Sequence, residues 1–374
     1  MAIACISAFP AMINPGMVSC DLALDSVLAR LGIEEKVDRF NFEQTRRVGS
    51  VNSRYLKDLD RLEDYRAIIF WGDFQHFLNY AALDLSRRER TRRGAKFERN
   101  KFLTEWAGRA FFSGRRSLQA RTIVFGETIY GLSGVDLAVT PYQRPLRQFL
   151  TNVADVQLRD PLSVAMAQQI APDGRIGFGC DCAFLLDADK VLPMKKANSA
   201  VEKRLPKKKF AVAAFGRSDE DERLTEFARK LADMAGIELV SMNWLAPGRY
   251  RAINTIADNI AIVRQAQFVV TDIYHLIVTT LRENRPVLGL GWGASHGRTT
   301  LDDKKKELLL RSYFGRHLYS FIEDVVAEER KALDRAAGSL RSESQHRVVR
   351  SACRKHRALS EARLGEALKR ILAA

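Results

Sequence analysis

Short apolar runs alternate along the chain with longer stretches in which apolar residues recur at helical spacing. Several of the short runs are β-branched and apolar on both faces, as buried parallel strands are. The runs predicted to form strands are Ile3–Ser7, Ala67–Trp71, Thr122–Phe125, Asp155–Leu158, Phe210–Phe215, Glu238–Met242, Phe268–Thr271 and Val287–Gly289.

The longer stretches between these runs predict helices. They are Cys20–Leu31, Asp219–Ala235, Thr255–Gln265 and Tyr274–Glu283. Glycines follow the first two, Gly32 and Gly236, and mark the expected helix ends. An alternation of strands and helices on this scale indicates an α/β fold with a mainly parallel sheet.

A basic segment, KKANSAVEKRLPKKK at 195–209, interrupts this alternation and predicts a linker or an exposed crossing between domains. A second strand–helix series begins directly after it. We therefore expect two Rossmann-like α/β domains, residues 1–200 and 207–315, with a cleft between them. Residues 316–374 predict an all-helical basic tail whose last helices pack back towards the first domain.

Composition narrows the class of protein. A length of 374 residues suits two domains, and 46% hydrophobic with 28% charged residues excludes wholesale disorder. No uninterrupted apolar run approaches the roughly 20 residues of a membrane-spanning helix. No basic start precedes the first apolar stretch, so we expect no secretory signal. Five cysteines, an odd number, suit a reducing cytosol.

The net charge of +15 is concentrated in three segments. Residues 87–121, 195–209 and 335–374 carry net charges of +9, +6 and +7. Localised basic faces attract nucleic acid, an anionic membrane surface or a phosphorylated ligand, although solvated helix faces give the same pattern. Zinc-finger spacing and aromatic RNP strands are absent from the sequence, so we expect no specific nucleic-acid partner.

Ligands of open parallel sheets bind outside the carboxyl ends of the strands, which selects the residues that follow each predicted strand. Asn14 and Gly16 flank a turn whose N–H groups can meet an anion or a hydroxyl. Asp73 follows a strand and can serve as a general base or bind a sugar hydroxyl, or can simply cap the next helix. Gly126 would let a ligand approach the backbone. Each position is also compatible with an ordinary turn.

The second half offers two cationic candidates. Arg217 follows the strand Phe210–Phe215, and its guanidinium suits a phosphate or a carboxylate. His275 falls in the first turn of the helix Tyr274–Glu283, where it suits an anionic ligand or proton transfer. A structural role is the alternative for this histidine.

A glycine-rich loop, GWGASHGR, follows the last strand. Gly291 gives backbone freedom, Trp292 an aromatic platform and Arg298 a further cation. The alternative is a surface turn without a ligand.

Other chemistries lack their motifs. Cys180 and Cys182 have one residue between them and no second pair at zinc-like spacing, so we expect no metal. The sequence has no GxSxG elbow, no Walker A loop and no clean GxGxxG after a strand. These absences disfavour serine hydrolases, P-loop NTPases and simple dehydrogenases.

Four segments together resemble the polysaccharide pyruvyl transferase family. That family typically shows an R-D-x-x-S segment, an Asp-x-x-Phe-Leu-like segment, a strand followed by an Arg-x-His helix start and a G-x-P-V strand, and a lysine-containing segment before a short helix. The matching segments here are Arg159–Ser163, Cys180–Leu186, FVVTDIYHLIVTTLRENRPVLGLGW and LDDKKKELLLRSYFG. The resemblance covers most of residues 1–315 and is most specific at 156–186 and 268–315.

The resemblance implies a GT-B-like fold, with an acceptor-side first domain and a donor-side second domain. It also implies transfer of a pyruvyl group from phosphoenolpyruvate, as co-substrate, onto two hydroxyls of a sugar, with no further cofactor. The expected acceptor is a sugar or lipid-linked oligosaccharide of a bacterial surface polysaccharide. We therefore expect a cytoplasmic enzyme, with peripheral attachment to the inner face of the membrane as a further option.

The resemblance also assigns roles to residues. His275 matches the motif histidine and would protonate the donor or its leaving phosphate, and Asp73 would take a proton from the acceptor. The residues expected on the donor side are Arg217, Arg298, Gly291 and Trp292, and those on the acceptor side are Asn14, Gly16 and Gly126.

One position departs from the family pattern, because the motif arginine two residues before His275 is Ile273. Either another cation takes over (Arg298, Arg217 or Arg285), or the donor differs, or the activity is lost. Two other functions stay open: a GT-B glycosyltransferase that uses a nucleotide sugar, and a non-catalytic glycan-assembly protein that has lost its donor site.

Overall fold

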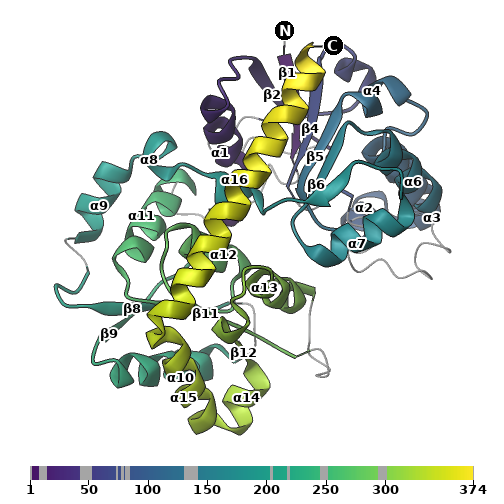
Figure 1. Cartoon of the computed structure of the whole chain (residues 1–374). Coiled ribbons are helices and arrows are strands. Elements are labelled where there is room, and N and C mark those ends of the chain that lie inside the picture. The colour runs from purple at the N-terminus through teal and green to yellow at the C-terminus, as the bar shows by residue number, and fades with distance from the viewer. Residues whose placement is uncertain are drawn as a thin grey trace. The chain divides into compact units, whose positions relative to one another are not determined.

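A computed structural model of the chain describes residues 2–7, 15–42, 53–72, 75–76, 80, 85–129, 142–202, 205–216, 220–244, 252–293 and 301–373. These residues form two separate parallel sheets with helices packed beside them (Figure 1). The chain divides into two compact units. The first unit comprises Met1–Met12, Val27–Leu185 and Arg357–Ala374, and the second comprises Ile13–Ser26 and Leu186–His356.

The first unit contains a seven-stranded sheet in the order β3-β2-β1-β4-β5-β6-β7. Its strands are β1 (Ala2–Ser7), β2 (Lys36–Asn41), β3 (Arg54–Tyr55), β4 (Ala67–Trp71), β5 (Thr122–Glu127), β6 (Asp155–Leu158) and β7 (Ile176–Phe178). All neighbouring strands are parallel. Every residue of β4 and β5 is buried, as in central strands that are covered on both faces.

The helices of the first unit follow its strands. They are α2 (Ser86–Arg93), α3 (Arg99–Ala110), α4 (Arg116–Ala120), α6 (Gln143–Asn152) and α7 (Pro161–Ile170), with short 3₁₀ turns at Leu59–Leu62, Gly94–Lys96 and Cys182–Leu185.

The second unit contains a five-stranded parallel sheet in the order β12-β11-β10-β8-β9. Its strands are β8 (Phe210–Ala214), β9 (Glu238–Ser241), β10 (Val269–Thr271), β11 (Val287–Gly291) and β12 (Tyr319–Phe321). Its helices are α8 (Ala188–Val191), α9 (Met194–Glu202), α10 (Asp221–Met234), α11 (Ala252–Gln265), α12 (Tyr274–Arg282), α13 (Leu301–Ser312), α14 (Ile322–Ala327) and α15 (Glu329–Arg341), with a 3₁₀ turn at Arg316–Leu318.

Two helices contribute residues to both units. Both α1 (Pro15–Arg30) and α16 (Glu343–Ala373) begin in the second unit and end in the first. The second of these helices has 31 residues. In the first unit, Arg363 of α16 pairs with Asp155 at 2.6 Å. Leu364 and Leu368 beside it are fully buried. The last part of α16 is therefore part of the core of the first unit.

The predicted fold class is confirmed: both sheets are parallel and flanked by helices, and the C-terminal segment is helical from Ile322 onward. All eight predicted strands form. The prediction of an all-helical tail was wrong at its start, because Tyr319–Phe321 pairs with β11 and extends the second sheet. The basic segment at 195–209 is not wholly irregular, since α9 begins before it and packs against α11. Within the described ranges, no helix is long and apolar enough to cross a membrane.

Candidate active site

The carboxyl edge of the second sheet positions the start of helix α12. Thr271, the last residue of β10, donates a hydrogen bond from its hydroxyl to the carbonyl of Ala214 at the end of β8, at 2.6 Å. The same hydroxyl accepts a hydrogen bond from the N–H of Ile273 at 3.0 Å. Ile273 is the N-cap of α12, with an extended backbone. One buried hydroxyl thus fixes two strand ends and the first turn of a helix.

His275 lies in this first turn and is half-buried. Its Nε2 is 3.9 Å from Sγ of Cys20 on α1. A methyl group at Gly16, one turn earlier on α1, would overlap the His275 ring. The ring of Tyr274 meets it edge-on, with centroids 5.2 Å apart. The start of α1 therefore fixes the imidazole at a helix N-terminus, where the helix dipole favours an anion.

A buried lysine supports the loop before α12. Lys306 of α13 is 1% exposed, and its Nζ donates to the carbonyl of Asp272 at 2.9 Å. The same Nζ is 2.9 Å from Oδ1 of Asp303. The hydroxyl of Tyr319 donates to the Asp303 carbonyl at 3.3 Å, and burial raises the pKa of that hydroxyl. Lys306 thus fixes the backbone between β10 and α12 in place.

Lys306 lies in the segment LDDKKKELLLRSYFG, but the sequence pattern did not predict a role for this residue. The signal was present, because Asp303 precedes Lys306 at i,i+3 spacing, which places both on one helix face. Three consecutive lysines resemble a solvated face, and only the packing of α13 shows that Lys305 and Lys306 are buried and Lys304 is exposed.

The position of the family's motif arginine is apolar and closed. Ile273 is 3% exposed. Of the three cations proposed to replace the arginine, Arg285 lies just before β11, at the amino edge of the parallel sheet, and donates its backbone N–H to Thr280. His275 lies beyond the carboxyl edge. Arg285 therefore lies at the other edge of the sheet from His275, and a role for Arg217 or Arg298 stays a prediction.

Several predicted site residues lie outside the described ranges. They are Asn14, Asp73, Arg217 and Arg298. Their roles stay predictions.

The other predicted residues have packing roles. Gly291 leaves room for the Tyr319 hydroxyl and the Asp303 carboxylate. Trp292 is 8% exposed and belongs to the apolar core of the second unit. Gly126, with φ of +74°, leaves room for the Cys182 thiol, whose Sγ would be 2.5 Å from an added Cβ. A binding role for these residues stays a prediction.

The R-D-x-x-S segment stabilises the first unit. The Asp160 carboxylate accepts hydrogen bonds from the Ser163 N–H at 2.7 Å and from the Thr128 hydroxyl at 2.7 Å. Asp160 thereby caps α7 and fixes the loop after β5. Arg159 forms a buried ion pair with Asp181 at 2.8 Å. The two motif segments of the first unit therefore meet each other.

A buried histidine and a buried glutamate lie beside that loop. His76 Nδ1 is 2.5 Å from Oε2 of Glu127, and His76 Nε2 lies 2.9 Å from the carbonyl of Ala110, to which it donates. Both side chains are at most 2% exposed and lie among phenylalanine rings. His76 follows the end of β4 and Glu127 ends β5, and no local sequence pattern pairs them. The pair connects the segment that follows β4 to the end of β5.

Comparison with known proteins gives one family match. The model of the family described as polysaccharide pyruvyl transferase matches residues 22–294. No curated protein matches the sequence significantly.

Similar solved structures include UDP-GlcNAc 2-epimerase from Neisseria meningitidis, at 8% identity and a TM-score of 0.49, with 99% of this chain and 100% of that chain covered. An α,α-trehalose-phosphate synthase from Burkholderia vietnamiensis has 11% identity and a TM-score of 0.47, with 100% and 99% covered. At these identities the likenesses say nothing about substrate.

Proposed function

Because the chain belongs to the polysaccharide pyruvyl transferase family, we propose that it transfers a pyruvyl group from phosphoenolpyruvate to two hydroxyls of a sugar in a bacterial surface polysaccharide. The product is a cyclic ketal. The observation that carries the proposal is the placement of His275, which matches the motif histidine, at the N-terminus of α12 beyond the carboxyl edge of the second sheet.

The bonds and protons of this reaction balance without a cofactor. The two sugar oxygens form bonds to C2 of the enolpyruvyl group, and the bond from C2 to the phosphate oxygen breaks. The two hydroxyl protons leave the sugar. One proton is added to the methylene carbon, which becomes the methyl group, and the other ends on the released phosphate.

In this proposal His275 supplies a proton to the methylene carbon or to the departing phosphate. Gly16 and Cys20 hold its ring from one side, so the imidazole meets the donor in one orientation. Arg217 and Arg298 bind the phosphate and the carboxylate of the donor in place of an arginine at Ile273. Asp73 takes a proton from an acceptor hydroxyl.

The proposed acceptor is carried on a lipid at the cytoplasmic face of the membrane. The basic segments 87–121 and 335–374 would then attract the anionic leaflet, at about 1 kcal/mol for each nearby Lys or Arg.

The test is turnover by the full chain of phosphoenolpyruvate with lipid-linked and nucleotide-linked sugars. Phosphate release and the mass of the ketal are the readouts. We expect His275→Asn to lower turnover about 100-fold or more, which is the usual contribution of a general acid. The control is His356→Asn on α16, whose Nδ1 lies 3.0 Å from the Tyr313 hydroxyl. It should turn over as the unchanged chain does.

Two other outcomes would contradict the proposal. Release of a nucleoside diphosphate from a nucleotide sugar, with phosphoenolpyruvate untouched, would favour a glycosyltransferase. Glycan binding without turnover of either donor would favour a non-catalytic assembly protein.

A further inference from the structure

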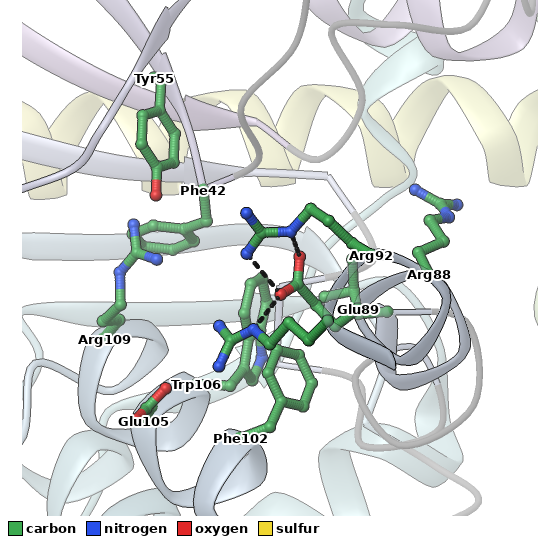
Figure 2. A pocket seen from close by; sticks show the side chains of 11 residues that line it. Phe42, Tyr55, Arg88, Glu89, Arg92, Phe102, Glu105, Trp106 and Arg109 are labelled. Atoms are coloured by element: carbon green, nitrogen blue, oxygen red, sulfur yellow. Dashed lines mark hydrogen bonds and ion pairs between the residues drawn. The ribbon is translucent and has the colours of Figure 1, made fainter. Parts of the chain in front are cut away.

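The first unit contains a cavity of about 350 Å³ at the carboxyl end of two strands. Phe42 directly follows β2, and Tyr55 ends β3. Leu85 and the helices α2 and α3 supply the rest of the lining (Figure 2). The carboxyl ends of parallel strands are where such sheets bind ligands. A volume of this size suits a small ligand.

The lining is rich in guanidinium groups. It includes four arginines and two glutamates: Arg88, Arg92, Arg93, Arg109, Glu89 and Glu105. Glu89 accepts hydrogen bonds from Arg92 and Arg93, each at 2.7 Å, as the dashed lines in Figure 2 show. Partial burial raises the pKa of Glu89, but these two arginines outweigh it and hold the pKa below its ordinary value. The carboxylate therefore stays charged and keeps both guanidinium groups in place.

A third guanidinium is fixed on the opposite wall. The Cζ atom of Arg109 lies 5.1 Å from the ring centroid of Phe42 and 5.7 Å from that of Tyr55. Arg109 also donates to the carbonyl of Leu56. Its Nε is buried and has no hydrogen-bond partner among the described residues. This cation is ordered before any ligand arrives, which reduces the entropy cost of binding.

The aromatic wall of the cavity carries a second unmatched donor. Trp106 is 6% exposed, and its ring packs edge-on against Phe42, with centroids 5.5 Å apart. The indole Nε1–H has no hydrogen-bond partner in the described part of the chain. Buried donors of this kind are almost always paired in native proteins.

We propose that this cavity binds the phosphate group of a phosphorylated sugar, with the sugar ring against the aromatic wall. The inference rests on the proposed function and gives its acceptor a chemical class, a sugar attached to a phosphate or diphosphate. Three guanidinium groups, those of Arg92, Arg93 and Arg109, suit a phosphate because it offers three acceptor oxygens and up to two charges. A carboxylate offers only two oxygens and one charge.

Calorimetric titration of the full chain tests the inference without phosphoenolpyruvate. The probes are glucose 1-phosphate, glucose and glucuronate. We expect glucose 1-phosphate to bind, with an affinity that falls as salt rises. Arg93→Gln and Arg109→Gln should each weaken it about tenfold or more, since each removes a charge-assisted hydrogen bond. Trp106→Phe makes the aromatic wall smaller and should weaken it several-fold.

The matched control is Lys101→Gln, which removes one charge from the exposed side of α3 outside the cavity. It should leave the affinity within about twofold. Equal weakening by Lys101→Gln and Arg109→Gln would overturn the site, since only net charge would then matter. Equal affinity for glucuronate and glucose 1-phosphate would overturn the phosphate assignment.

Two further probes identify the source of the phosphate. Tighter binding of a polyprenyl-diphosphate sugar in neutral micelles than of UDP-glucose would assign it to a lipid carrier. The reverse order would assign it to a nucleotide, and both results support the cavity.

The cavity assignment and the proposed reaction are contradicted by different results. If phosphoenolpyruvate is never consumed but glucose 1-phosphate binds and Arg109→Gln weakens it, the proposed reaction fails and the cavity stands. If the ketal forms and Arg93→Gln and Arg109→Gln turn over normally, the cavity assignment fails and the reaction stands.

Discussion

Gly16 illustrates how one missing side chain positions a reactive group. It lies in the first turn of α1, with the His275 ring where a Cβ would be. Nothing in its backbone conformation requires glycine, since its φ is not positive. The requirement comes from the imidazole alone. The sequence suggested a role in ligand binding for this glycine, and the structure gives it a role in orienting His275.

Gly16→Ala should therefore separate activity from stability. Alanine favours a helix by about 0.5–1 kcal/mol over glycine, so the unfolding midpoint in urea should change little. The added methyl group displaces the ring of His275, and turnover of phosphoenolpyruvate should fall about tenfold or more, because ångström-scale misplacement of a catalytic group costs rates of this order.

The control for this substitution is Gly338→Ala in α15 of the same unit, where an added Cβ meets open space. It should keep full turnover and gain slightly in stability. Unchanged turnover in Gly16→Ala would show that α1 does not hold the ring.

At the scale of elements, Arg264 of α11 joins three helices of the second unit. It donates two hydrogen bonds to the Asp189 carboxylate in α8, at 2.7 and 2.9 Å, and one to Glu283 at the end of α12, at 2.7 Å. The hydrogen bonds from Arg264 hold the pKa of Asp189 below its ordinary value of 3.8. The far end of the helix that carries His275 is thus tied to its neighbours.

Arg264→Gln should cost about 1 kcal/mol of stability at pH 7, a modest amount because Asp189 is largely exposed. A carboxyl group whose pKa is lowered by folding adds stability above its ordinary pKa and loses it as the pH falls through the lowered value. The difference between the unchanged chain and the variant should therefore shrink below pH 3.8.

Urea unfolding at pH 7 and at a pH below 3.8 measures this difference. Arg229→Gln, in an exposed pair with Glu226 on α10, should cost less than about 0.5 kcal/mol at either pH. A difference for Arg264→Gln that is equally large at both pH values would contradict the assigned role of Asp189.

The elements that were predictable are those with a pattern of their own. The buried central strand β4 is a short apolar run, and its predicted bounds match the structure. The missed strands β2, β3, β7 and β12 lie towards the sheet edges. The strand β2 mixes Lys, Asp and Arg with apolar residues, and β3 has two residues. Such strands form because a neighbour offers hydrogen bonds, which local sequence does not reveal.

The candidate site divides in the same way. His275 was predictable because a strand and a short turn precede it in the sequence and a helix follows it. Lys306, by contrast, acts on Asp272 from 34 residues away, and Cys20 meets His275 from 255 residues away. Contacts between distant segments depend on how helices pack, and no local pattern specifies them.

At the scale of the whole molecule, α16 completes the first unit, whose strands lie much earlier in the sequence. Its residue Glu361 accepts two hydrogen bonds from Arg30, at 2.7 and 2.9 Å, within the first unit. Cys180 is fully buried there, and burial raises the pKa of its thiol to about 12. Ser360 of α16 lies beside this thiol.

A chain that stops after His356 should expose this thiol. In the full chain we expect iodoacetamide at about pH 8 to leave Cys180 unmodified, because the thiol is neutral and covered. In the shortened chain Cys180 should be labelled within minutes, while Cys20 in the second unit should stay protected. Peptide mapping by mass spectrometry measures both. Protection of Cys180 in the shortened chain would show that the sheet and its own helices suffice to cover it.

The assignment of the last part of α16 to the first unit has a consequence for biosynthesis. A ribosome delivers the strands of the seven-stranded sheet within the first 178 residues, yet Leu364 and Leu368 of its core follow only after the second unit has been made as far as His356. The second unit needs α16 only as far as His356, so it can close before the last part of this helix emerges. The half of the protein that is made first is therefore finished last, and until then its uncovered apolar surface is what a chaperone would meet on the nascent chain.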